Sequence, residues 1–179
     1  LGHLQLTTGP GISRILTYGH EGTATGAAFV GYASAVEVTY TETAARGELH
    51  KANAAYRTAG PVETGKVIFS YANPAATGKS ALLDNGVSST GLAAYFAYNA
   101  TVGEMNVRLR HSASAGATVG AILFTFSKTD ATAAVAGAER QVTTGTVERY
   151  RWFEISTATA TGSLANFRYF GGVVNRPTS

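Results

Sequence analysis

Residues 147–156 read V-E-R-Y-R-W-F-E-I-S, and this stretch decides the fold class. One set of alternate positions holds Val147, Arg149, Arg151, Phe153 and Ile155, and the other holds Glu148, Tyr150, Trp152 and Glu154. Period-two alternation places successive side chains on opposite faces of a half-buried strand. Residues 106–111 repeat the pattern, with Val107 and Leu109 alternating with Arg108 and Arg110. We therefore predict β-strands in both stretches.

Short β-prone segments of this kind recur along the chain, separated by glycine-rich or polar turns. In the first part they are residues 13–18, 27–32, 35–41, 48–58 and 65–71. In the second part they are residues 91–98, 105–111, 119–126, 139–143, 147–156 and 164–174. No amphipathic helix of about 12 residues is visible, which argues against the helical crossovers of a parallel sheet. The predicted fold is all-β, with two small antiparallel β-sandwich or barrel units, the second Ig-like or jelly-roll-like.

A break in this rhythm suggests a domain boundary. Residues 73–90 read N-P-A-A-T-G-K-S-A-L-L-D-N-G-V-S-S-T and include Pro74, Gly78 and the Asn85-Gly86 turn pair. Proline and glycine at this density are typical of a linker. We predict a first β domain over residues 1–72, a linker over 73–90 and a β-sandwich domain over 91–179.

The composition excludes several classes of protein. Charged residues make up 14% of the 179 residues, against about 25% in typical soluble domains. The absence of cysteine rules out disulfides and thiolate metal sites. A net charge of +3 without a basic stripe does not indicate nucleic-acid recognition. No apolar run approaches the roughly 18 residues of a membrane span, so no membrane partner is expected.

No combination of residues indicates catalysis. The histidines, His3, His20, His50 and His111, show no metal-binding spacing, and no serine lies in a G-x-S-x-G turn. The acidic side chains are few and lie mostly beside arginine or threonine on expected strand faces. We expect no enzyme activity, no catalytic residue, no metal and no cofactor.

The densest group of large side chains gives the candidate surface-binding residues, Arg149, Tyr150, Arg151 and Trp152. Exposed aromatic rings beside arginine can stack on sugar rings or bases. The alternative is that half of these side chains fill the β core, as aromatic residues in small β proteins usually do. The sequence leaves both interpretations open, with the second favoured.

Two longer stretches resemble known proteins. The first contains I-L-T-Y-G-H-E-G-T-A-T-G-A-A-F-V-G (15–31), V-E-V-T-Y-T (36–41) and G-E-L-H-K-A-N-A-A-Y-R-T-A-G-P-V-E-T-G-K-V-I-F (47–69). It resembles the C-terminal half of tail tube proteins of long-tailed bacteriophages. The second, residues 84–177, contains G-L-A-A-Y-F-A-Y, V-R-L-R-H-S-A-S-A-G-A-T, A-E-R-Q-V-T-T-G-T-V-E-R-Y-R-W and L-A-N-F-R-Y-F-G-G-V-V-N-R-P. It is similar to a β-sandwich module appended to phage tail proteins.

The resemblance implies a structural subunit located in the virion tail. Such subunits form homo-oligomeric rings, commonly hexameric, that stack with other virion tail proteins into a tube through which DNA passes as cargo. The first half of a tube subunit has no counterpart here, so the chain is either a part of one or lacks its long inner hairpin. Few charges and many small residues suit β edges that assembly will cover.

The sequence therefore predicts a tail tube or tail-associated subunit that assembles with copies of itself. The alternative is a carbohydrate-binding or adhesion β-sandwich module, with glycan contact at Arg149–Trp152, or a capsid decoration protein.

Overall fold

The computed structural model describes residues 14–22, 24–43, 51–68, 78–99, 104–128, 137–159 and 168–176. Every regular element in these ranges is a β-strand, which confirms the all-β prediction. The strands of the first part are β1 (Arg14–Tyr18), β2 (Ala28–Thr43), β3 (Lys51–Thr58), β4 (Val62–Val67), β5 (Gly78–Lys79) and β6 (Leu83–Asp84). The later strands are β7 (Leu92–Asn99), β8 (Glu104–Ser112), β9 (Ala121–Lys128), β10 (Gly137–Thr143), β11 (Tyr150–Thr159) and β12 (Arg168–Asn175).

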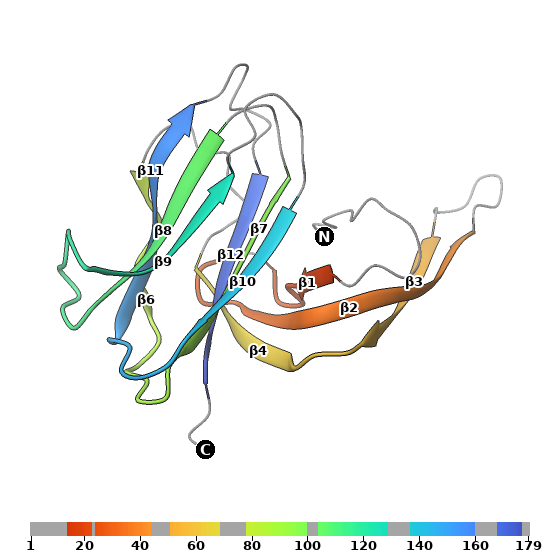
Figure 1. The fold of residues 1–179 in the computed structure, drawn as a ribbon, viewed down its shortest axis with the longest axis horizontal. Coiled ribbons are helices and arrows are strands. Elements are labelled where there is room, and N and C mark those ends of the chain that lie inside the picture. Colours follow the sequence, from red (N-terminus) through yellow and green to blue (C-terminus); the bar gives the residue numbers. More distant parts are fainter. Residues whose placement is uncertain are drawn as a thin grey trace.

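The strands form two antiparallel sheets (Figure 1). The large sheet has the order β1-β2-β4-β12-β7-β10, and β3 pairs with β2. The small sheet has the order β5-β11-β8-β9, and β6 pairs with β11 beside β5. A strand late in the chain, β12, therefore lies in the middle of the large sheet, between β4 and β7.

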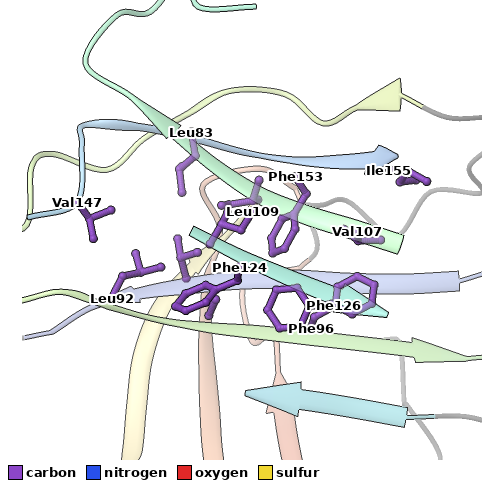
Figure 2. Packing of buried hydrophobic residues seen from close by; sticks show 13 residues of the cluster. Leu83, Leu92, Phe96, Val107, Leu109, Phe124, Phe126, Val147, Phe153 and Ile155 are labelled. Atoms are coloured by element: carbon purple, nitrogen blue, oxygen red, sulfur yellow. The ribbon is translucent and has the colours of Figure 1, made fainter. Parts of the chain in front are cut away.

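The main core lies between the two sheets (Figure 2). Its buried members are Ile68, Leu83, Leu92, Ala94, Phe96, Val107, Leu109, Phe124, Phe126, Val147, Phe153, Ile155 and Val173. The rings of Phe96, Phe126 and Phe153 come from both sheets and contact one another, with centroids 5.3–6.0 Å apart. Burying each such ring contributes roughly 1.5–3 kcal/mol, so this triplet is a main source of the cohesion between the sheets.

A second core fills the concave side of the large sheet, which curls back on itself. It contains Phe29, Val67, Ala93, Tyr95, Ala97, Phe170 and Val174. Strand β7 contributes to both cores, with Leu92, Ala94 and Phe96 on one face and Ala93, Tyr95 and Ala97 on the other. A strand buried on both faces needs apolar side chains at consecutive positions, which explains the run L-A-A-Y-F-A.

The first part of the chain differs from the sequence prediction in several respects. The strand expected over residues 65–71 is β4, which begins earlier, at Val62, and ends at Val67. Residues 27–32 and 35–41 were expected as separate strands, but both lie within the single 16-residue strand β2. A shift of register against β1, between Tyr32 and Ala35, absorbs the intervening residues as a β-bulge, so the strand continues.

The predicted division into residues 1–72, 73–90 and 91–179 stays a prediction. The large sheet passes across it, because Val67 and Lys66 of β4 pair with Gly172 and Val173 of β12. The described part of the predicted linker also pairs with the sandwich: β5 and β6 lie along β11, and Ser88 forms an isolated bridge to Val147.

Candidate assembly arm and the charged cluster at its base

Strand β2 is longer than the strands beside it. It pairs with β4 only as far as Tyr32 and with β1 only as far as Ala35. Beyond that point its partner is β3, with a register that runs from Ala35 opposite Thr58 to Thr43 opposite Lys51. Figure 1 shows these two strands projecting from the sandwich as a two-stranded hairpin. We call residues 36–43 and 51–58 the β-arm.

Within the described residues, both sides of the β-arm end in an open β edge. Among the described strands, none pairs with the outer edge of β2 beyond Ala35, and none pairs with the outer edge of β3. A hairpin with two such edges is only marginally stable in water, because too few of its groups are buried. Open edges of this kind are also templates for another strand. The β-arm is therefore the part of the described structure best suited to pairing with a partner.

The arm begins where β3 gives way to β4 along the same side of β2. Gly60 and Pro61 separate the two strands, and proline cannot donate a backbone hydrogen bond to the ladder. The chain is held on either side of this break, because Ala59 N–H donates to Ser34 O (3.1 Å) and Ala33 N–H donates to Pro61 O (3.2 Å). A second shift of register, between Glu37 and Thr39, indicates a bulge in the arm itself. Such bulges turn a strand away from the sheet it leaves.

Apolar side chains are exposed beside the base of the β-arm. Tyr18 is 50% exposed and lies opposite Val30, while Val62 is 54% exposed and lies opposite Tyr32. Opposite residues in a sheet share a face, and neighbouring strands bring these two pairs close together. The outer face of the sheet here offers contact area to a protein that reaches the arm.

A charged cluster lies on the inner side of the curled sheet, next to the base of the β-arm. The Arg140 guanidinium from β10 donates two hydrogen bonds to the Glu63 carboxylate from β4, with Nη2–Oε1 at 2.7 Å and Nε–Oε2 at 2.8 Å. The buried phenol of Tyr95 on β7 donates to the same carboxylate, and Arg140 Nε also lies 3.2 Å from its oxygen. Strand β4 is adjacent to neither β7 nor β10, so these hydrogen bonds join Glu63 to strands on the far side of β12 and hold the curl closed.

The cluster keeps its charges in fixed states. Burial opposes ionisation of Glu63, but the hydrogen bonds from Arg140 and Tyr95 outweigh it, so the pKa of this carboxyl is lowered. Burial and the adjacent Glu63 carboxylate raise the pKa of the Tyr95 phenol, which stays protonated. The hydrogen bond to Glu63 raises the pKa of Arg140. The arrangement is a bidentate ion pair with a phenol donor, in which both oxygens of the Glu63 carboxylate accept hydrogen bonds.

The structure separates the four candidate surface-binding residues into two pairs. Arg149 is exposed, binds the Asp84 carboxylate through Nε (2.8 Å) and Nη2 (2.7 Å), and lies 5.4 Å from the centroid of the Tyr150 ring. Arg151 and Trp152 are fully buried. Their placement on the surface was therefore wrong, whereas binding at Arg149 and Tyr150 stays a prediction.

Trp152 is covered by a segment distant in sequence. A Cβ at Gly120 would lie 2.5 Å from Trp152 Cη2, so the backbone of that glycine packs directly against the indole. The ammonium of Lys79 lies 5.9 Å from the ring centroid and adds a cation–π contact. The outward face of β11 is thus closed at this point, and the indole is out of reach of a glycan.

Arg151 points into one end of the sandwich. Its Nη1 donates to Asn175 Oδ1 (2.6 Å) and its Nη2 donates to Gly86 O (2.8 Å), while Nε has no hydrogen-bond partner in the structure. Burial lowers the pKa of Arg151 to about 10. Both acceptors are uncharged, so this cation is held without the direct carboxylate partner that a buried arginine normally needs.

The histidine and acidic side chains of the described ranges lie apart from one another or in pairs. These residues contain no group of three or more His, Asp or Glu side chains placed to hold a metal ion. His111 accepts a hydrogen bond from Glu148 N–H (2.9 Å), and burial lowers its pKa. His20 lies 4.0 Å from Glu21 on the surface, and His3 and His50 fall outside the described residues. Over the same ranges, no helix is long and apolar enough to cross a membrane.

Sequence reasoning missed the β-arm and the Glu63–Tyr95–Arg140 cluster. Both strands of the arm were predicted, but nothing local indicated that they would extend beyond their neighbours. Glu63 and Arg140 are 77 residues apart, and neither belongs to a motif. The one local signal was a tyrosine within the otherwise apolar run of β7, because a buried phenol needs a polar partner.

No family model, no curated protein and no solved structure matches this chain.

Proposed function

We propose that this protein is a structural subunit that assembles with copies of itself through the β-arm, as a tail tube or tail-associated protein of a virion. The observation that carries the proposal is the extension of β2 and β3 beyond the sandwich, with an edge on each side that no described strand covers. A natural protein normally covers or blunts such edges. Pairing with a neighbouring copy on each side covers both.

The two edges of the arm are different, and this favours a particular mode of assembly. If the outer edge of β2 in one copy pairs with the outer edge of β3 in the next, each copy offers one donor surface and one acceptor surface. Such head-to-tail contacts build rings when the rotation between copies closes, and filaments when it does not. The similarity of residues 15–69 to tail tube proteins supports the ring.

The surroundings of the arm support the same function. The exposed side chains of Tyr18 and Val62 lie at its base, where a neighbouring copy would rest. The ion pair between Glu63 and Arg140 stiffens the curled sheet from which the arm extends. A rigid base lowers the entropy that is lost when the arm is ordered against a partner.

The decisive experiment is sedimentation velocity and negative-stain electron microscopy of the purified protein over a concentration series. Self-assembly through the arm predicts oligomers that grow with concentration and appear as rings or short tubes. A protein that stays monomeric and featureless at every concentration contradicts the proposal. Rings would also support the virion assignment, which a search for this chain among the proteins of purified phage particles would test directly.

A second function rests on one exposed contact. The Arg149 guanidinium lies over the Tyr150 ring and is fixed there by Asp84, which gives a preformed planar surface that could stack against a sugar. Binding to a glycan array that is lost in Tyr150→Ala would favour an adhesion module. Binding that is unchanged in that variant would remove this surface from consideration.

A further inference from the structure

The end of the sandwich that holds Arg151 has an unusual electrostatic arrangement. A fully buried guanidinium donates to the oxygen of a side-chain amide and to a backbone carbonyl, and its Nε has no partner among the described residues. Leaving a buried cation without a counter-ion costs several kcal/mol in typical proteins. An anion formed next to this side chain would therefore be stabilised, provided that it arises within reach of the guanidinium.

Asn85 is within that reach. Its Nδ2 donates to Asn175 Oδ1 (3.3 Å), the same oxygen that accepts the hydrogen bond from Arg151 Nη1. Asn175 Nδ2 in turn donates to the backbone oxygen of Asn85 (2.9 Å). The amide nitrogen of Asn85 and the guanidinium of Arg151 thus both donate to Asn175 Oδ1. A carboxylate at position 85 would lose the hydrogen bond to Asn175 Oδ1 and would lie on the other side of that oxygen from the guanidinium, separated from it by one side-chain amide.

Asn85 is also the one asparagine in the sequence that precedes a glycine. Gly86 has a φ of +67°, and a Cβ built on it would meet nothing within 4 Å, so no other part of the described structure crowds this side of the turn. The N–H of Gly86 lies 3.4 Å from Asp84 Oδ1, and the residue is exposed to solvent. Asparagine before glycine is the sequence in which the following backbone nitrogen most readily attacks the side-chain carbonyl.

We propose that Asn85 is a self-modification site, at which spontaneous deamidation creates the carboxylate that becomes the counter-ion of the buried Arg151. The proposal is independent of the assembly function. It requires water as the only co-reactant and gives ammonia as the only by-product.

The reaction balances without an oxidant or a reductant. The Gly86 nitrogen forms a bond to Cγ of Asn85 and loses its proton towards the Asp84 carboxylate. The amide nitrogen of Asn85 takes up a proton and leaves as ammonia, which produces a succinimide. Water then adds to one of the two ring carbonyls, and the bond from that carbon to the ring nitrogen breaks. The product is aspartate or isoaspartate at position 85, and either carries one new carboxylate.

A mass measurement tests the reaction with internal controls. Trypsin cleavage after Lys79 and Arg108 gives one peptide that contains Asn85, Asn99 and Asn106. After incubation of the folded protein at mildly alkaline pH, we expect the mass increase of one deamidation, located by fragmentation at Asn85 and absent from the other two. An intact amide at Asn85 in the folded protein, while the urea-unfolded chain deamidates under the same conditions, would overturn the proposal.

A variant tests the role of the product. Asn85→Asp is expected to raise the thermal midpoint at neutral pH, and the gain should disappear as the pH falls through the titration of the new carboxyl, because only the ionised form pairs with Arg151. Ser89→Asp adds the same charge at an exposed position of the same loop and should give no such gain. An Asn85→Asp protein that is less stable than the unmodified chain would contradict the counter-ion role.

Discussion

The ring of Tyr95 occupies the space that a side chain at Gly31 would need: a Cβ at Gly31 would lie 2.6 Å from Tyr95 Cζ. Gly31 pairs with Glu63 across β2 and β4, and Glu63 is the residue that accepts the hydrogen bond of the Tyr95 phenol. Because Gly31 has no side chain, the Tyr95 ring from β7 can reach the Glu63 carboxylate on β4.

Gly31→Ala should destabilise the protein because the added methyl group overlaps the Tyr95 ring. The Tyr95 ring is fully buried and packs against Phe29, so the overlap must be relieved by moving the ring or the strand. We expect a loss of about 1–3 kcal/mol in the free energy of unfolding, measured by urea denaturation. Gly78→Ala is the matched control, because a Cβ at Gly78 meets nothing within 4 Å. Equal stabilities for the two variants would show that the ring is easily displaced.

Glu63→Gln should remove the ion pair at the base of the β-arm and lower stability by about 2 kcal/mol at neutral pH, because Arg140 keeps its charge and loses its anion. The effect depends on pH in a defined direction. The pKa of Glu63 lies below its ordinary value of 4.5 in the folded state, so the folded protein binds this proton less readily than the unfolded chain. The stabilisation is therefore complete above about pH 4.5 and is lost as the pH falls through the folded pKa.

The measurement is the difference in unfolding free energy between Glu63→Gln and the unchanged protein as a function of pH. It should be largest near neutrality and should shrink on acidification. A difference that stays constant down to strongly acidic pH would mean that the carboxylate contributes through packing alone.

Shortening the β-arm should abolish self-assembly and leave the sandwich folded. Thr39 lies opposite Ala55 in the register, so residues 40–54 can be replaced by Asn-Gly, the two-residue turn that joins directly opposed positions. We expect this variant to sediment as a monomer at concentrations where the unchanged chain forms oligomers. Its circular dichroism and thermal midpoint should remain close to those of the parent. Oligomers that persist in the shortened protein would place the interface elsewhere.

Trp152 should behave as a buried indole, because its exposed fraction is 0% and the chain has no other tryptophan. We expect a blue-shifted emission maximum and weak quenching by acrylamide, both of which revert to the values of free tryptophan in urea. Added oligosaccharide should leave the emission unchanged. Native emission like that of the unfolded chain would return Trp152 to the candidate glycan-binding surface.

Alternation along single strands allowed much of the fold to be predicted. The pattern in residues 147–156 groups Val147, Phe153 and Ile155 on one face of the strand, and in the structure these three side chains lie in the core. The pattern does not indicate that Trp152 is buried, because this side chain is covered by Gly120, which lies between β8 and β9. Periodicity reports the two faces of a strand and contains no information about what lies on them.

Strand pairing and the candidate site were beyond the reach of local patterns. The pairing of β4 with β12 joins segments about a hundred residues apart, and no residue in either strand specifies its partner. The Glu63–Arg140 pair and the Asn85–Asn175–Arg151 contacts exist only because these strands meet. The sequence can indicate which side chains would need polar partners when buried, but the partners follow from the topology.

The position of β12 between β4 and β7 has a consequence for synthesis on the ribosome. Strands β4 and β7 are translated long before residues 168–175 emerge. Until then, the backbone N–H and C=O groups with which they pair to β12 have no partner strand. The nascent protein must therefore keep a gap in the middle of its largest sheet until its last described strand is inserted. Premature closure of that gap, by β4 pairing with β7 or with another nascent chain, is the misfolding route to which this topology is most exposed.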